Sequence, residues 1–242
     1  TQKPTALMAL GMAPSFILIL SGYCLLLATP HLPLAVHAVE YSFSNDAADT
    51  PAGDRFTEEV GEEYALQVLA SAADFILTLF RQNSAADQKP VESVRLVVED
   101  SEGAPYTRDG TIYLSGGYLD GYDADNLKRE VTGTLYHEMT HVLQWTGNGE
   151  APDGLLEGMA DFVRLKAGYP KSDWANYGEG EKWDDGYGVT ARFLDYLEER
   201  QRGFVAALNQ KMKDGYEDRF FAELAGEPVA ELWNGYKAKF NQ

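Results

Sequence analysis

The stretch "GTLYHEMTHVLQW", residues 133–145, carries the strongest signal for the fold and places two histidines, His137 and His141, four residues apart. Residues at this spacing lie on one face of an α-helix, so the two imidazoles can converge on a single metal ion. Apolar residues recur at helical spacing before and within the stretch, which predicts a helix over residues 125–145. The sequence therefore predicts a helix that presents a pair of metal-ligating side chains.

Glu138 directly follows the first histidine and completes a His-Glu-x-x-His pattern. It lies about 100° around the helix from His137, where its carboxylate can reach water at the metal. Zinc lowers the pKa of such water to roughly 7, and a carboxylate can take the proton as the water attacks a peptide carbonyl. The pattern indicates a zinc-dependent hydrolase, and the alternative is that both histidines are hydrogen-bonded core residues.

The N-terminal segment has the character of a secretory signal peptide. The run Ala6–Thr29 contains no charged residue, Lys3 precedes it, and a small-residue pattern ends at Ala38. The alternative is an uncleaved membrane anchor, because the run is long enough to span a bilayer. We therefore expect a signal peptide over residues 1–38, a single secreted domain over residues 39–242, and no membrane association after cleavage.

The charge of the chain limits its partners. It has 38 acidic and 20 basic residues, a net charge of −18. Nucleic acid and anionic membrane surfaces would repel such a chain, so neither is expected as a partner. The single cysteine, Cys24, lies in the predicted signal, which leaves the mature chain without a thiol or a disulfide. Its stability must then come from its core and any bound metal.

The histidine count limits how the metal site is completed. Two of the four histidines, His31 and His37, fall in the predicted signal, which leaves only the pair in the motif. A catalytic zinc ion needs a third protein ligand, and without a further histidine or cysteine this ligand must be a carboxylate. A three-histidine site is thereby excluded, and so is a Ser-His-Asp or Cys-His triad that does not recruit a motif histidine.

The next predicted helix offers two carboxylates for this role. In "GLLEGMADFVRLKAG", residues 154–168, Glu157 and Asp161 stand four residues apart and share one helical face. Glu157 can ligate zinc while Asp161 accepts a hydrogen bond from the non-ligating nitrogen of a zinc-bound histidine. The opposite assignment, with Asp161 as the ligand, stays open. The glycine-rich turn at residues 146–154 suits a sharp reversal between the two helices.

Hydrophobic periodicity predicts the other elements. Alternating and continuous apolar runs predict strands over residues 39–45, 93–99 and 110–119. A loop is expected over residues 45–54, and a helical stripe predicts one long helix over residues 56–80. Further helices are expected near residues 125–145, 153–167, 189–201, 203–212, 216–225 and 228–240. This order predicts an α+β fold, with a small N-terminal sheet and a long helix before a mainly helical C-terminal part.

Two longer stretches resemble a known family. They are "YHEMTHVLQWTGNGEAPDGLLEGMADFVRLKAGY", residues 136–169, and "WDDGYGVTARFLDYLE", residues 183–198, and the likeness extends over nearly all of the mature chain. Both are similar to the plant basic secretory proteins, a peptidase family of plants and bacteria grouped with the zincins. The resemblance implies a zincin-like fold and a secreted zinc peptidase, in which the two motif histidines bind zinc and Glu138 is the catalytic base.

By similarity to the gluzincins, whose second motif has the form Glu-x-x-x-Asp, the resemblance also implies that Glu157 is the third ligand. The chain departs from the family name in being strongly acidic. The binding partners of the family are therefore not carried over to it.

A peptidase must also stabilise the oxyanion of its tetrahedral intermediate, and no histidine remains for this task. Tyr187 is a candidate because Gly186 and Gly188 place it on a predicted loop, and the helix that follows carries a second candidate, Arg192. The alternative is that these two residues are a core aromatic and an ion-paired arginine. The predicted strand at residues 111–115 is either an edge strand that binds extended peptide by main-chain pairing or an ordinary buried strand.

Together these features predict a secreted zinc peptidase with one zinc ion per chain and peptides or proteins as substrates. The predicted site consists of the ligands His137, His141 and Glu157, the base Glu138, the oxyanion candidate Tyr187, and Asp161 beside a ligand histidine. The rival prediction is a secreted, defence-associated binding protein with a structural zinc and little or no turnover. Glu138 favours catalysis, because a structural site does not need a carboxylate beside its first histidine.

Overall fold

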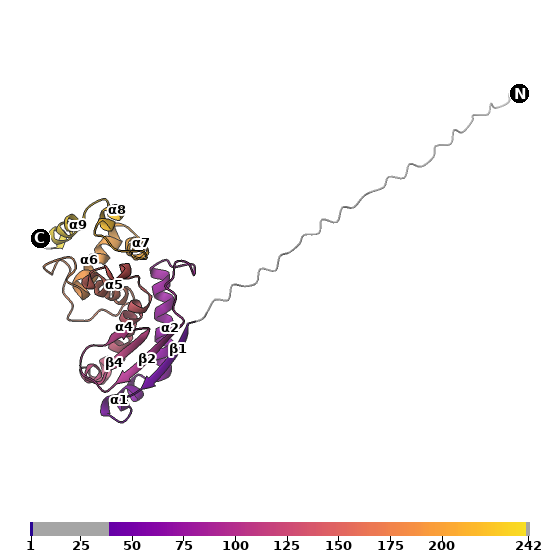
Figure 1. Cartoon of the computed structure of the whole chain (residues 1–242), viewed down its shortest axis with the longest axis vertical. Helices are drawn as coiled ribbons and strands as arrows, with labels where there is room; N and C mark the ends of the chain where they lie inside the picture. The colour runs from indigo at the N-terminus through magenta and orange to yellow at the C-terminus, as the bar shows by residue number, and fades with distance from the viewer. Residues whose placement is uncertain (2–38, 241–242) are drawn as a thin grey trace. The chain divides into compact units, whose positions relative to one another are not determined.

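The computed structural model describes Thr1 and residues 39–240 (Figure 1). The predicted signal peptide lies, apart from Thr1, outside the described residues. The helices and strands of the described residues all belong to one compact unit. In the described part of the chain, no helix combines the length and the apolar character needed to cross a membrane.

A small mixed sheet forms the N-terminal part of the fold. Within residues 39–240 it has four strands in the order β1-β2-β4-β3. These strands are β1 (Glu40–Asn45), β2 (Ser93–Glu99), β3 (Tyr106–Arg108) and β4 (Thr111–Ser115). Strands β1, β2 and β4 run parallel, whereas β3 runs antiparallel to β4. The predicted strands at residues 39–45 and 93–99 are confirmed, and the buried apolar run of β2 is typical of a parallel sheet.

The predicted strand at residues 110–119 is too long. It ends at Ser115, whose hydroxyl accepts a hydrogen bond from the backbone N–H of Tyr118 and so begins the short helix α3 (Gly116–Asp120). The alternative of an edge strand at residues 111–115 is wrong, because β4 lies between β2 and β3. The edge next to β4 is β3 (Tyr106–Arg108), a strand of three residues that is too short to predict from alternation.

The predicted long helix at residues 56–80 is in fact two helices, α1 (Pro51–Glu59) and α2 (Glu62–Leu79). Between them Gly61 has a φ of 82°, a backbone conformation that favours glycine and that no helix can continue through. Helix α1 begins inside the predicted loop, because Thr50 caps it by accepting a hydrogen bond from the N–H of Gly53.

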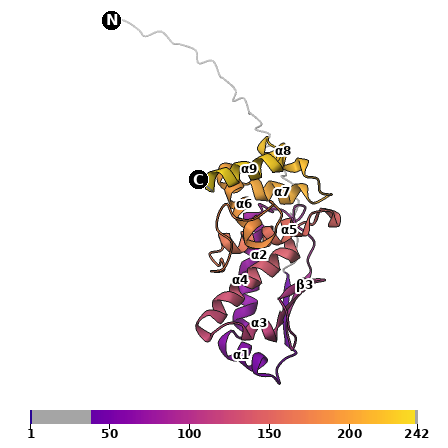
Figure 2. The same cartoon turned by 90° about the vertical axis from the view of Figure 1, so that its left-hand side faces the viewer.

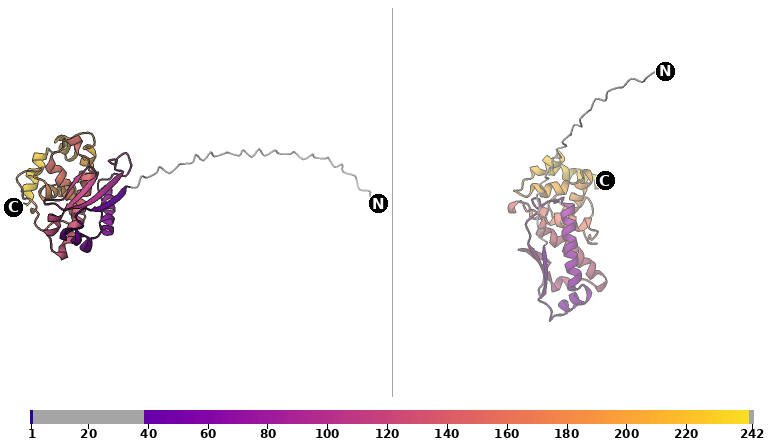
Figure 3. Two further views of the ribbon diagram at one scale, coloured as in Figure 1. Left: turned by 60° about the horizontal axis from the view of Figure 1, so that its bottom comes forward. Right: turned by 90° about the vertical axis from the view of Figure 1, so that its right-hand side faces the viewer.

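The second half of the described chain is helical, as predicted. Its helices are α4 (Ala124–Leu143), α5 (Asp153–Lys166), α6 (Tyr187–Arg200), α7 (Phe204–Lys211), α8 (Arg219–Ala225) and α9 (Val229–Phe240). Helices α2 and α4 pack against each other on one face of the sheet, as Figures 2 and 3 show. Helices α5 to α9 gather at the end of the unit opposite α1 (Figure 1). The observed fold is α+β, with a small mixed sheet and a mostly helical remainder.

Helices α5 and α6 approach each other through two glycines of α5. A Cβ atom on Gly154 would lie 1.8 Å from the carbonyl oxygen of Asp184, and one on Gly158 would lie 2.2 Å from Cγ2 of Thr190. No larger side chain fits at either position without displacing backbone or a packed neighbour. This glycine seam holds Glu157, which lies between the two glycines, beside the start of α6.

Candidate active site

Five of the predicted site residues come from two helices that pack against each other, α4 and α5. Helix α4 carries His137, Glu138 and His141, and helix α5 carries Glu157 and Asp161. The connection between them contains a short 3-10 turn, Gly147–Gly149, in which all three residues have a positive φ. Glycine and asparagine adopt this conformation at little cost, so the chain reverses sharply here and brings α5 alongside α4.

The structure brings three candidate metal-ligand atoms together between these two helices. Nε2 of His137 lies 3.1 Å from Nε2 of His141 and 3.2 Å from Oε2 of Glu157, and the remaining pair is separated by 3.6 Å. Ligands at zinc–nitrogen and zinc–oxygen distances of about 2.0–2.1 Å in a tetrahedron are separated by roughly 3.3 Å. The three residues therefore form a group that can hold one metal ion, and the spacing of their atoms fits zinc.

Asp161 lies behind the first histidine and not among the ligand atoms. Its Oδ1 atom is 2.7 Å from Nδ1 of His137. Because a carboxylate only accepts hydrogen bonds, this contact directs the Nδ1 proton to Asp161 and turns Nε2 toward His141 and Glu157. The contact matches the arrangement in which Glu157 is a ligand and Asp161 orients His137.

The site favours positive charge at His137. Burial alone would lower the pKa of His137, but hydrogen bonds with Asp161 and Glu157 outweigh it and raise this pKa to about 9. Burial acts to raise the pKa of Glu157, but the hydrogen bonds of His137 and His141 hold it well below its usual range. Carboxylates around an imidazole stabilise a cation at this point, whether a proton or a metal ion carries the charge.

Glu138 is buried beside the candidate ligands and accepts a hydrogen bond from a residue of the sheet. Only 4% of its surface is exposed, and Oγ1 of Thr107 donates a hydrogen bond to its Oε2 atom over 2.8 Å. Thr107 belongs to the edge strand β3, so a residue of the sheet orients the Glu138 carboxylate of α4. Sequence reasoning missed Thr107, because nothing in its local pattern marks a contact with a residue 31 positions away.

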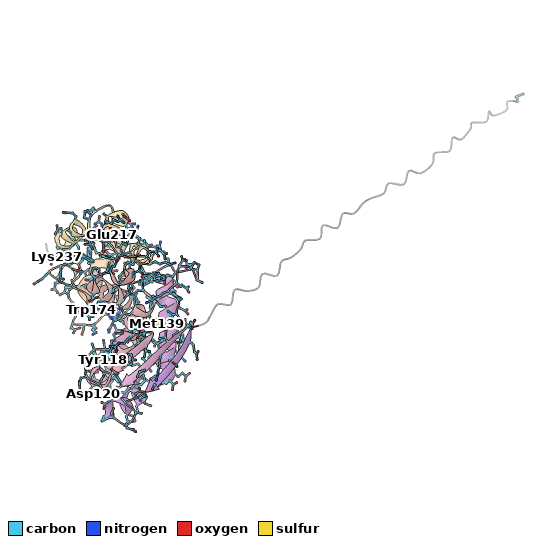
Figure 4. All side chains as sticks on the ribbon, viewed as in Figure 1. Tyr118, Asp120, Met139, Trp174, Glu217 and Lys237 are labelled. Atoms are coloured by element: carbon cyan, nitrogen blue, oxygen red, sulfur yellow. The ribbon has the colours of Figure 1, made fainter. Side chains whose placement is uncertain are left out.

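The ligand atoms open into a cavity of about 590 Å³. One wall of this cavity is residues 104–107, which include part of β3. Another part of the lining is Lys171, Asp173 and Trp174, from the long loop between α5 and α6. Figure 4 labels Trp174 and Tyr118, two residues that line the cavity, on the flank of the unit away from β1.

A second cavity of about 440 Å³ adjoins the first. The two cavities share His141, Leu156, Glu157 and Tyr187, and the second one continues toward residues 184–186. The hollow surface therefore continues past His141 and Glu157 toward the segment that precedes α6.

Tyr187 lies at the rim, between the two cavities. It is the first residue of α6 and not part of a loop, and its φ of 42° turns the backbone sharply into the helix. Its side chain is 57% exposed, and its ring lies parallel to that of His137 with 6.2 Å between the centroids. Burial, followed by the nearby carboxylates of Glu157 and Asp161, raises the pKa of Tyr187. The hydroxyl is therefore protonated at neutral pH and can donate a hydrogen bond.

Arg192 is not brought to the site. Its Nε atom donates a hydrogen bond to the carbonyl oxygen of Ala175 over 2.5 Å, and its guanidinium lies 4.6 Å from the centre of the Tyr177 ring. It lines neither cavity. Arg192 instead anchors the loop between α5 and α6 to the helix that follows it.

The chain belongs to the basic secretory protein family, described as peptidases of plants and bacteria, whose family model matches residues 36–236. The predicted family resemblance is thus confirmed. A basic secretory protease of Boswellia serrata is 42% identical over 59 residues, which are 24% of this chain and 67% of the relative. No solved structure matches the chain significantly.

Proposed function

We propose that this chain is a secreted zinc-dependent peptidase of the zincin type. The single observation that carries the proposal is the cluster of His137, His141 and Glu157, whose ligand atoms lie 3.1–3.6 Å apart next to the carboxylate of Glu138. The family description supports peptidase activity, and the name of the Boswellia relative supports secretion.

His137, His141 and Glu157 would hold the metal, with Asp161 fixing the orientation of His137. One bound zinc ion supplies Lewis acidity, which makes water a nucleophile near neutral pH. Glu138 accepts the proton of the attacking water and returns it to the leaving amine. Tyr187 donates a hydrogen bond from the rim to the oxyanion of the tetrahedral intermediate.

The shape of the site supports cleavage within a peptide chain. The two cavities adjoin at His141 and Glu157, and together they would give room for substrate residues on both sides of the scissile bond. The edge strand β3 forms one wall of the larger cavity, and an edge strand can bind extended peptide by main-chain pairing. We therefore propose an endopeptidase acting on extended peptides or on exposed protein segments.

The rival function, a defence-associated binding protein with a structural zinc, has less support. A structural zinc site is closed by four protein ligands, whereas three ligand atoms here face a cavity. A buried carboxylate beside the ligands also has no role in a structural site.

The test compares the zinc-loaded chain with its Glu138→Ala variant on a peptide library, with products identified by mass spectrometry. The native chain should cut within peptides whose N-terminus is acetylated, and the variant should bind zinc without cutting. Equal cleavage by the two would contradict the role of Glu138, and no cleavage by either would favour the binding protein. A native chain that binds no divalent metal at neutral pH would contradict the proposal as a whole.

A further inference from the structure

Gln144 is a buried polar residue next to the ligands to which the proposed mechanism assigns no role. It follows the last residue of α4, its backbone N–H bonds to the carbonyl of Thr140, and only 1% of its surface is exposed. Its amide Nε2 lies 2.8 Å from Nδ1 of His141. Its Oε1 atom is also buried and has no hydrogen-bond partner in the described part of the chain.

The chemistry of metal binding decides which end of this amide faces His141. A histidine that ligates through Nε2 is neutral there and carries its remaining proton on Nδ1, so Nδ1 is a donor and needs an acceptor. An amide NH2 group cannot accept, whereas an amide oxygen can. A half-turn about the last bond of the Gln144 side chain exchanges the two ends and brings Oε1 to Nδ1.

We infer that Gln144 is the positioning residue of the second ligand histidine, with Oε1 accepting the Nδ1 proton of His141 when the site holds its metal. The inference rests on the proposed function. Each motif histidine then has a hydrogen-bond acceptor at its Nδ1 atom, since Asp161 accepts the Nδ1 proton of His137 in the same way. The supports differ in charge and in origin: Asp161 is a carboxylate from α5, and Gln144 is a neutral amide that follows the same helix as its histidine.

The test measures zinc affinity of the full chain by competition with a chelator of known affinity. Gln144→Met keeps the length of the side chain and removes the acceptor, so its Kd should rise by about 10- to 100-fold. Gln144→Glu keeps an acceptor and cannot donate, so its Kd should stay within about threefold of the native value or fall below it. Gln82→Met is the matched control, because Gln82 is 2% exposed and lines neither cavity, and its Kd should not change.

A spectrum of the zinc-loaded chain supplies a readout independent of affinity. The imidazole Nδ1–H of His141 should give a slowly exchanging proton signal in the native chain and in Gln144→Glu, and this signal should weaken in Gln144→Met. It is distinguished from the Nδ1–H signal of His137, which should change in the Asp161→Asn variant and not in Gln144→Met. Circular dichroism of each variant in excess chelator shows whether the fold is intact.

Three outcomes would overturn the inference. In the first, Gln144→Met binds zinc as tightly as the native chain. In the second, Gln144→Glu is as weak as Gln144→Met although both are folded, which would mean that the amide acts as a donor or only as packing. In the third, the native chain binds no zinc at all, and then the proposed function fails as well. The first two outcomes leave the proposed function standing, so the two failures are distinguishable.

Discussion

The floor of the candidate active site, formed by residues of α4 and α5, and its rim at Tyr187 are held in place in different ways. On the floor, His137, Glu138 and Asp161 are 8%, 4% and 3% exposed, and each is held by a hydrogen bond from another element. On the rim, Tyr187 is 57% exposed and is placed by the backbone turn at the start of α6. Water can replace an exposed donor but not a buried ligand or its partner. Substitutions on the floor should therefore lower zinc affinity and activity far more than substitutions on the rim.

The largest effect is expected from Glu157→Gln, because an amide is a weak metal ligand and only two ligands would remain. Both zinc binding and cleavage should be lost, with kcat/KM falling by about 1000-fold or more, the factor that about 4 kcal/mol gives. Peptide cleavage and chelator competition measure the two losses. Glu231→Gln, an exposed position on α9, is the matched control and should behave as the native chain.

Asp161→Asn, also on the floor, should have a smaller effect on zinc binding than Glu157→Gln. The amide still reaches Nδ1 of His137 but lacks the carboxylate charge, so zinc affinity should fall by about 10- to 100-fold. Chelator competition compares this variant directly with Glu157→Gln. A greater loss in Asp161→Asn than in Glu157→Gln would mean that Asp161 is the ligand, the assignment that the sequence leaves open.

On the rim, Tyr187→Phe should lower kcat by about 10-fold, less than the 10²–10³ measured for removal of a well-positioned oxyanion donor. KM and zinc affinity should stay close to native values, because the phenylalanine ring keeps the packing beside His137. Steady-state kinetics on one cleaved peptide measure both constants. Native kcat in this variant would remove Tyr187 from the mechanism and leave its ring as a wall of the cavity.

Arg192→Leu should have the smallest effect on activity, with kcat within about twofold of native, because the residue lies outside both cavities. The lost hydrogen bond to Ala175 should lower stability by about 1 kcal/mol, which corresponds to a Tm lower by about 3 °C. A thermal melt and the same kinetic assay check the two parts. A large fall in kcat with an unchanged Tm would contradict the anchoring role.

The floor of the site was predictable because its residues are local in sequence. Two pairs of side chains four residues apart, one pair on each of two consecutive helices, suffice to identify His137, His141, Glu157 and Asp161 as candidates. Gln144 was available to the same reasoning, since it stands three residues after His141. The sequence does not distinguish ligand from partner, because that choice depends on how α5 packs against α4.

The walls of the site depend on contacts between distant residues, and the sequence did not reveal them. Strand β3 has three residues, and Thr107 reaches Glu138 across 31 positions. Tyr187 and Arg192 lie on one helix, and only the packing of that helix shows which of them faces the cavity. The break at Gly61 was missed for a related reason, since the apolar stripe continues through it and a single glycine only weakly predicts a helix end.

The glycine seam between α5 and α6 makes one wall of the cleft more tightly packed than the other. At Gly158 the backbone of α5 packs against the side chain of Thr190 of α6, and at Gly154 it packs against the carbonyl oxygen of Asp184 just before α6, so Glu157 and Tyr187 stand on closely packed segments. The other wall is a three-residue strand paired on one side only, the kind of element with a low free energy of local opening. We therefore expect a substrate in the cleft to displace the strand more readily than the helices, and such a displacement would act on Glu138 through its hydrogen bond with Thr107.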